Sequence, residues 1–468
     1  MVRSSSFMHH GDNYLFGENG QYTDLCLKIA DDIFSSYPSM ALIGKNEDRI
    51  NAYSHMDYLK EPRNISVLCQ EKALPIRKIR AARCILSGRL FTEHAAAGEA
   101  TRLGLGTKYL INLKNSLSLS RISELMSKDQ GNHVPEKEIV EKAGCAPGDL
   151  FPLSLGTRHM LQFSFDIYNL AKEFNMDPVK ALAKQKMLII LNEASADTII
   201  QEMIENRFFG FARENVMFMI QKAYHGIRFH NGKAFFDHTS PKRLHNHGSL
   251  VIQQTAHDQI FTMDWHEKRV FLKNYEYGNC LESMDDKITY NIEDLEFLTG
   301  AIDYEALGFA LERGEHGVGM LMEIVRNDPE NPQKGGMAAY DPRLEKNVMI
   351  EGFQLMGIRN HQITFLNKNF NHYPRPYQSW AAVKESGLNM PIAVKGGYVY
   401  FQPVQGDINF LVNTEFYRRE NIKSIRAWKS IANTPLAIGH MRMQDQQDGF
   451  PDYAEWIMGR RLAEEQTM

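Results

Sequence analysis

Cysteine is scarce in this sequence. Five cysteines occur in 468 residues, and no two of them form a C-x-x-C pair. They are Cys26, Cys69, Cys84, Cys145 and Cys280. This scatter argues against a disulfide framework and against a zinc knuckle, and it suits a reducing compartment. We therefore expect a cytoplasmic protein.

An excess of positive charge and a long apolar run are also missing. The formal net charge is −4, so no overall basic field favours nucleic acid as a partner. No apolar run reaches the roughly 18 residues that a membrane span needs, and the polar N-terminus has no signal-peptide core. Tandem repeats and low-complexity tracts are absent as well. The composition indicates a globular protein with neither nucleic acid nor membrane as a partner.

Apolar residues at helical spacing mark the first part of the chain. Leu25, Ile29 and Ile33 recur every four residues, which predicts a helix over Tyr22–Tyr37. We interpret residues 1–80 as a helical N-terminal extension. A polar segment over 114–149 reads as an insertion, with a helix predicted at Pro135–Ala143 because proline suits a first turn.

From about residue 160 the pattern alternates between helix and strand. A helix is predicted over Met160–Phe174, and Ser195 is expected to cap another between the apolar runs "MLIIL" and "VMFMI". A strand, a helix and a strand of this spacing make a βαβ unit. Further strands are expected at Ile85–Phe91, Gly319–Val325, Val348–Ile350, Ile363–Leu366, Tyr398–Phe401 and Ile408–Val412. The predicted class is α/β with a mostly parallel sheet.

The stretch Ala95–Lys108, "AAAGEATRLGLGTK", is the first candidate for chemistry. Glycines at 98, 104 and 106 let backbone N–H groups turn toward an anion. Arg102 offers a planar fork for phosphate oxygens, and Lys108 offers a compact charge. A plain flexible turn with solvated basic residues is the alternative.

The segment "AGEATRLG" resembles the nucleotide-binding loop of the UDP-sugar pyrophosphorylases, L-x-G-G-x-G/A-T-R-L/M-G followed by P-K. The matching residues are Gly98, Ala100, Thr101, Arg102, Leu103 and Gly104. Ala97 stands in place of the first glycine, and Thr107 stands in place of the proline before the lysine. The resemblance implies that Gly98, Thr101 and Gly104 bind substrate and that Arg102 and Lys108 hold phosphates.

Two later segments resemble the part of the family that reads the base. "ILNEASADTIIQEMIENRFFGFARENVMFMIQ" is similar to the family's strand, helix and strand ending in glutamine, which makes Gln221 a candidate for the uracil edge. "LHNHGSL" stands where the family has a glycine turn on the base, with His247 and Gly248 as the matches. His245 and His247 could equally be a satisfied loop pair, and zinc spacing is absent.

"CLESMDDKI" resembles the family's strand end V-D-N, whose aspartate meets the metal and the sugar nucleotide. Asp285 and Asp286 are both candidates, because Mg²⁺ prefers oxygen ligands and bridges phosphates. Either residue could instead simply begin a turn.

The remaining matches concern the sugar and a second lysine. Gly335 and Gly336 in "PQKGGMAAY" resemble a V-G-V segment, and Glu351 in "MIEG" resembles an acidic strand. "FLNKNFNHY" resembles the family's asparagine stretch, with Asn367 or Asn369 on the sugar. Lys395 in "AVKGG" is a candidate for the second family lysine, near the α-phosphate.

The resemblance spans residues 85–375 and implies a Rossmann-like, nucleotide-diphospho-sugar transferase-like sheet. It implies a catalytic domain over 81–380, followed by an α+β region over 381–468. The implied reaction joins UTP and a sugar 1-phosphate, with Mg²⁺, to give a UDP-sugar and pyrophosphate. A non-catalytic nucleotide-sugar binder and a UDP-sugar-dependent glycosyltransferase remain alternatives.

Overall fold

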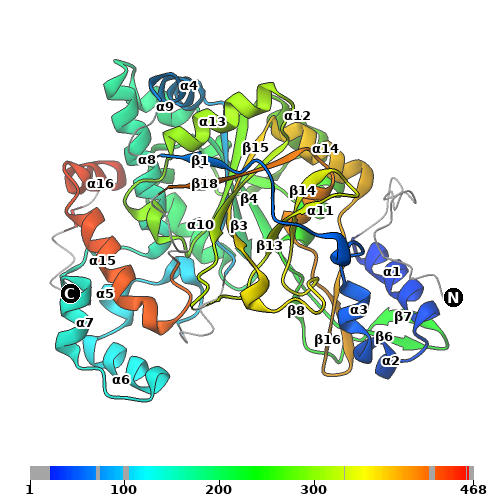
Figure 1. Ribbon diagram of the computed structural model, residues 1–468. Coiled ribbons are helices and arrows are strands. Elements are labelled where there is room, and N and C mark those ends of the chain that lie inside the picture. Colours follow the sequence, from blue (N-terminus) through cyan, green and yellow to red (C-terminus); the bar gives the residue numbers. More distant parts are fainter. Residues whose placement is uncertain are drawn as a thin grey trace.

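A twelve-stranded mixed sheet forms the centre of the computed structural model (Figure 1), which describes residues 22–69, 74–98, 105–330, 332–420, 427–459 and 461–462. Its strands follow in the spatial order β1 (Ser66–Leu68), β18 (Thr414–Arg419), β12 (Met320–Arg326), β15 (Phe365–Pro374), β11 (Asp286–Asn291), β2 (Leu90–Ala95), β3 (Lys186–Asn192), β4 (Val216–Gln221), β9 (Phe261–Met263) and β10 (Arg269–Phe271). The pair β13 (Met337–Asp341) and β14 (Lys346–Ile350) attaches beside β15.

The middle of this sheet is parallel. β11, β2, β3 and β4 run side by side in one direction, whereas β15 and β9 run against their neighbours. The register pairs Asn291 with Ala95, and Asn192 with Gln221, so four strands end along one edge of the sheet. We call this the carboxyl edge, and the edge where these strands begin the amino edge. The predicted α/β class is confirmed.

The apolar strands at the centre are buried on both faces. In β3, Met187, Ile189 and Leu191 belong to one apolar cluster, while Leu188 and Ile190 belong to another on the opposite face. Alternate side chains of a strand point to opposite faces, so burial of both faces requires a continuous apolar run. The strand predictions at "MLIIL" and "VMFMI" are confirmed for this reason.

Helices cover both faces of the sheet (Figure 1). On one face lie α4 (Pro75–Leu86), α8 (Leu155–Glu173), α9 (Pro178–Ala183), α10 (Ala196–Glu205) and α13 (Tyr304–Glu315). On the other lie α11 (Gly248–Ala256), α12 (Asn274–Glu282) and α14 (Pro376–Ser386). In the described part of the chain, no helix is both long and apolar enough to span a membrane.

A small second sheet stands beside the main one, next to the N-terminal helices (Figure 1). Its strands are β16 (Ile392–Lys395), β17 (Tyr398–Phe401), β6 (Ile227–His230) and β7 (Lys233–Phe236), with the short pair β5 (Ala223–Tyr224) and β8 (Arg243–Leu244) nearby. It shares an apolar cluster with α1 (Tyr22–Ser36), α2 (Met40–Lys45) and α3 (Glu47–Asn51). The helix predicted at Tyr22–Tyr37 is confirmed as α1.

The predicted insertion packs against the C-terminal helices at the far side of the molecule (Figure 1). It contains α5 (Leu113–Ser116), α6 (Leu119–Gln130) and α7 (Glu136–Ala143), and α7 contacts α15 (Thr434–Asp445), which precedes α16 (Phe450–Met458). The main sheet draws β1 from the segment before residue 80 and β18 from the segment after residue 380. Strand pairing therefore crosses both expected domain boundaries.

Three local predictions are corrected by the structure, the first two at Ile85 and Ser195. Ile85 ends a helix rather than beginning a strand, since α4 runs to Leu86 and β2 begins at Leu90. In a short apolar run the spacing of hydrophobic residues does not distinguish a buried helix from a buried strand. Ser195 precedes α10, but its side chain makes no cap and donates to Oδ1 of Asn192 instead.

The segment Ile408–Val412 is not a strand either. Residues Gln405–Phe410 form a 3-10 helix, labelled η9, and the strand follows as β18. The side chain of Asn409 takes the place of a strand neighbour: its Oδ1 accepts from the Met349 N–H at 3.0 Å, and its Nδ2 donates to the Met349 carbonyl at 3.0 Å. These two bonds satisfy the backbone N–H and carbonyl of Met349, which would otherwise need hydrogen bonds from a neighbouring strand.

Candidate functional site

A cavity of about 360 Å³ lies at the carboxyl edge of the main sheet. Its walls come from the ends of β2, β4 and β11, from the loop before α11, from β15 and from η9. In open α/β sheets, ligands bind beyond the carboxyl ends of the strands. Among the predicted site residues, the cavity brings together Gly98, Lys108, Gln221, His247 and Glu351.

The backbone after β2 fixes one end of the cavity. Asn192 Nδ2 donates to the Ala97 carbonyl at 2.9 Å, and the Lys108 N–H donates to the Gly98 carbonyl at 3.0 Å. Lys108 is thereby held where the loop returns to the sheet. Thr101, Arg102 and Gly104 lie outside the described residues, so their roles stay predictions.

Lys108 takes part in a cluster of three charges. Its Nζ donates to one carboxylate oxygen of Glu293, and Nζ of Lys429 lies 3.3 Å from the other oxygen. Burial raises the pKa of the Glu293 carboxyl, but Lys429 and Lys108 outweigh burial and lower it overall. Glu293 is therefore ionised, and the three side chains together carry one net positive charge at neutral pH.

Lys429 and Glu293 are functional candidates that the sequence analysis missed. Glu293 follows the end of β11, so correct placement of that strand would have found it. Lys429 has no local motif. The Trp428 N–H donates to the Glu293 carbonyl at 2.9 Å, and the Trp428 ring is fully buried, so tertiary contacts bring Lys429 beside Glu293, although Lys429 does not itself line the cavity.

The wall opposite Lys108 is formed by the end of β4 and the loop before α11. Gln221 Nε2 donates to the His245 carbonyl at 2.8 Å, and the nearby Leu244, Asn246 and His247 line the cavity. His247 Nδ1 accepts from the Gln405 N–H at 3.1 Å. His245 itself is buried, and its Nδ1 bonds to the Tyr22 hydroxyl at 2.9 Å. His245 is therefore a packed core histidine.

Gly248 serves a close backbone approach. Its N–H donates to the Pro403 carbonyl at 3.0 Å, and a Cβ at this position would lie 2.4 Å from the Val404 nitrogen. Such a contact with backbone is too short for any side chain, so glycine is required here. In the structure this glycine packs on residues 403–404 and is not part of the cavity wall.

A third group of polar side chains comes from β14, β15 and the segments around them. Glu351, Asn367 and Asn371 line the cavity, and the Asn367 N–H donates to the Gly336 carbonyl at 3.0 Å. A Cβ at Gly336 would lie 3.4 Å from both Glu351 carboxylate oxygens. Desolvation raises the pKa of Glu351. Asn369 is on β15, and its side chain is outside what the structure describes.

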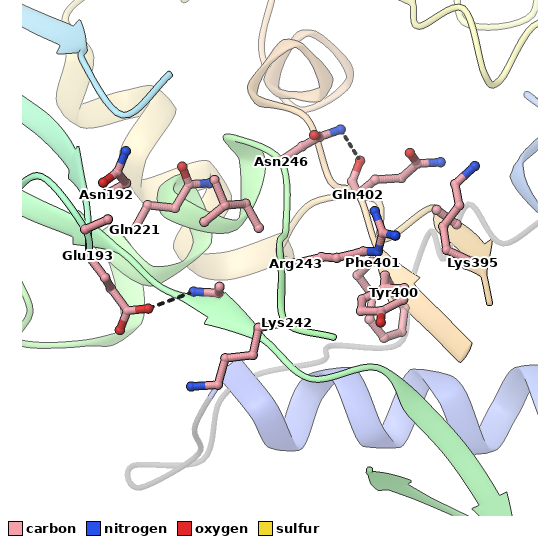
Figure 2. Close-up of a pocket in the computed structure, with 14 residues that line it drawn as sticks. Asn192, Glu193, Gln221, Lys242, Arg243, Asn246, Lys395, Tyr400, Phe401 and Gln402 are labelled. Atoms are coloured by element: carbon pink, nitrogen blue, oxygen red, sulfur yellow. Dashed lines mark hydrogen bonds between the residues drawn. The ribbon is translucent and has the colours of Figure 1, made fainter. Parts of the chain in front are cut away.

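Lys395 lines a different hollow, of about 530 Å³, next to the cavity. Figure 2 shows this hollow with Gln221 and Asn246 on one side and Lys395 on the other. Lys242 and Arg243 also border it, and Asn246 Nδ2 donates to the Gln402 carbonyl at 3.5 Å. The structure therefore does not bring Lys395 into the cavity that holds Lys108.

Asp285 and Asp286 are at the amino edge, where β11 begins, and not at the strand end that we expected. Asp285 pairs with Arg89 at 2.6 Å, and the buried Asp286 bonds to Nδ1 of His372 at 2.5 Å. Burial raises the pKa of both carboxyls. Across the described ranges, no three His, Cys, Asp or Glu side chains are grouped so that they could hold a metal. The residues present do not fit the expected magnesium site.

The strand end that faces the cavity has another composition. β11 finishes with Thr289, Tyr290 and Asn291, all of which line the cavity. Tyr290 is almost fully buried and stacks on Phe297 at 4.5 Å. The last three residues of β11 therefore carry no carboxylate that could hold a metal at this end of the strand.

The fold is α/β with a mixed sheet whose central strands are parallel, and the cavity lies beyond the carboxyl ends of those strands. No family model matches the chain, and no curated protein matches it in sequence. The solved structures similar to it include UDP-sugar pyrophosphorylases, and at 11–12% identity this similarity establishes the fold.

One similar structure is the UDP-N-acetylglucosamine pyrophosphorylase from Trypanosoma brucei in complex with an inhibitor, at 12% identity and TM-score 0.58. The match covers 90% of this chain and 84% of that one. Another is a variant UDP-glucose pyrophosphorylase from Leishmania major in complex with UDP-glucose, at 11% identity and TM-score 0.52, covering 89% and 78%.

Proposed function

We propose that this chain transfers a uridylyl group between UTP and a sugar 1-phosphate, forming a UDP-sugar and pyrophosphate. The observation that carries the proposal is the cavity itself. It joins the loop residues Gly98 and Lys108 to Gln221 and Glu351, on a fold similar to that of UDP-sugar pyrophosphorylases. A volume of about 360 Å³ is within the range of small-molecule sites.

Each wall of the cavity suits one part of a nucleotide sugar. The lysines at Glu293 would bind the phosphates, because ammonium groups donate charge-assisted hydrogen bonds to phosphate oxygens. Gln221 Nε2 donates a hydrogen bond to the His245 carbonyl. Its Oε1 would then accept a hydrogen bond from the imide N–H of uracil. Glu351, Asn367 and Asn371 would hydrogen-bond to the hydroxyls of the sugar.

The reaction would be an in-line displacement. An oxygen of the sugar 1-phosphate attacks the α-phosphorus of UTP, the bond to the bridging oxygen breaks, and pyrophosphate leaves with that electron pair. The chain positions the two phosphates and offsets their charge, and it forms no covalent intermediate. In this proposal Lys108, on the cavity wall, and Lys429, beside Glu293, would offset the charge of the leaving phosphates. Arg102 remains a sequence-based candidate for the same task.

The test is the reverse reaction with a panel of UDP-sugars. Purified protein is incubated with pyrophosphate, supplied as its magnesium salt, and UTP release is measured for each sugar. Release from one sugar supports the proposal and identifies the substrate. If a folded Arg102→Ala variant no longer releases UTP, the loop that carries Arg102 takes part in the site. Full activity in that variant would contradict a role of the loop in binding phosphate.

A non-catalytic nucleotide-sugar binder is the second candidate, and the β11 strand end favours it. The last three residues of β11, Thr289, Tyr290 and Asn291, offer no carboxylate to a metal at the cavity. A UDP-sugar that raises the melting temperature without any UTP release would support the binder. Consumption of UDP-sugar without pyrophosphate would instead indicate a glycosyltransferase.

A further inference from the structure

Each acidic side chain that lines the cavity within the described part of the chain is either paired inside the protein or desolvated. Three carboxylates line the cavity: Glu93, Glu293 and Glu351. In phosphate-transfer sites a protein usually holds Mg²⁺ through one or two carboxylates together with the phosphates of the substrate. The state of each carboxylate therefore decides whether the cavity can recruit such a cation.

Glu93 is fully engaged. Its side chain is buried on β2, and Nζ of Lys287 lies 3.3 Å from Oε2. Gln254 Nε2 donates to the same oxygen at 3.2 Å, and Gln405 Nε2 donates to Oε1 at 3.0 Å. Both oxygens have donors and the charge has a buried counterion, so a metal ion would have to displace an ion pair.

Glu293 is engaged more strongly still. Each of its oxygens faces a lysine, Lys108 on one side and Lys429 on the other. A cation that approached this carboxylate would meet two ammonium groups first, and like charges repel. An anion that approached the same cluster would meet one net positive charge.

Glu351 is the third carboxylate, and it has no cation beside it among the described residues. Desolvation raises the pKa of its carboxyl, which favours the protonated form. Geometry also disfavours a metal here, since no three His, Cys, Asp or Glu side chains of the described residues are grouped so that they could hold one. The two aspartates that the sequence suggested for the metal are at the amino edge.

We propose that this cavity binds the phosphates of its ligand without a divalent cation. Lys108 and Lys429 supply the positive charge, and Glu293 is their internal counterion until the ligand displaces it. The inference rests on the proposed function, since it concerns the same cavity and the same class of ligand. A phosphate competes with Glu293 for the lysines, so removal of that carboxylate strengthens phosphate binding.

The test is a calorimetric titration of the full chain with UDP and with uridine, each in EDTA and in excess Mg²⁺. We expect the UDP dissociation constant to agree within about twofold between the two buffers. Glu293→Gln should bind UDP about tenfold more tightly, because a competing carboxylate is gone, and should bind uridine as the wild type does.

The matched control is Glu296→Gln. Glu296 also bonds to two cations, Lys368 at 2.7 Å and Arg419 at 2.8 Å, but it does not line the cavity. Its removal should leave the UDP affinity unchanged. A melting curve of each variant verifies that the protein is folded before the titration.

The opposite results separate the two proposals. UDP binding by the wild type only in Mg²⁺, or weaker UDP binding by Glu293→Gln, would make Glu293 a metal ligand and overturn the inference while the proposed function stands. If the wild type binds UDP in neither buffer, the proposed function fails and the inference fails with it.

Discussion

The two edges of the main sheet carry acidic residues in different states. At the amino edge, Asp285 pairs with a surface arginine, and Asp286 is buried against His372. At the carboxyl edge, Glu93 and Glu293 form a cavity wall, and lysines hold both. The direction of a strand, and not the type of its residues, decides which acids face a ligand.

The largest expected effect is at the lysines of the carboxyl edge. Lys108→Met should lower kcat/KM for UTP formation by about a hundredfold or more. The variant loses the ammonium group that would stabilise the negative charge of the leaving phosphates. Lys395→Met is the matched control from the neighbouring hollow and should change the value by less than about threefold. Equal losses in both variants would show that the hollow in Figure 2 belongs to the active site.

The next effect concerns stability at the amino edge. Asp286→Ala removes the partner of the buried His372 and should lower the free energy of unfolding by about 3 kcal/mol. Urea denaturation measures this loss. The fraction that remains folded should bind UDP with unchanged affinity. A specific loss of affinity would mean that the two edges are coupled.

The free energy of unfolding should depend on pH through Asp407, a buried acid that has no counterion among the residues that the structure describes. Asp407, on η9, is buried, and burial followed by repulsion from Glu351 raises its pKa to about 8. Between an unfolded pKa of about 4 and this value, the native state holds a proton that the unfolded state lacks. Stability should therefore fall as the pH rises from about 4 to 8, by at most about 1.4 kcal/mol per unit.

Replacing Asp407 by asparagine tests the origin of that fall. The variant keeps the shape of the side chain but cannot ionise, so its urea midpoint should vary less between pH 5 and pH 8 than that of the wild type. Equal slopes in the two proteins would assign the pH dependence to other groups.

The smallest expected effect is at Asp285. Its ion pair with Arg89 is partly exposed, and such pairs contribute about 0–1 kcal/mol. Asp285→Asn should leave both the UTP-forming rate and the Mg²⁺ dependence of that rate unchanged. A shifted Mg²⁺ dependence would restore the metal site that the sequence suggested.

Much of the fold could be predicted from periodicity. The four-residue spacing before residue 37 gave α1, and continuous apolar runs gave β3 and β4, because these patterns reflect burial directly. β18 could not be predicted in this way. Its residues "TEFYRR" mix apolar and charged side chains, and the buried Arg419 is stabilised by ion pairs with Glu323 and Glu296, each at 2.8 Å.

Residues that line the candidate cavity could be predicted where they stand beside a recognisable strand or loop end, while their roles in binding stay predictions. Gln221 closes an unmistakable apolar strand, and Lys108 closes a glycine-containing loop. Asp285 and Asp286 misled because the sequence shows that acids adjoin a strand but does not show at which end of it they lie. Lys395 was selected for its place before two glycines, but it ends β16, a strand of the second sheet.

The sequence by itself determined the α/β class, the parallel centre of the sheet and the loop that leads to Lys108, since local pattern and burial specify these. Only the tertiary structure decided that Lys429 meets Glu293, 136 positions earlier in the chain, that Tyr290 lies at the strand end beside the cavity, and that the acids at 285 and 286 are at the opposite edge of the sheet. Charge pairing depends on distance in space, and chain order does not record that distance.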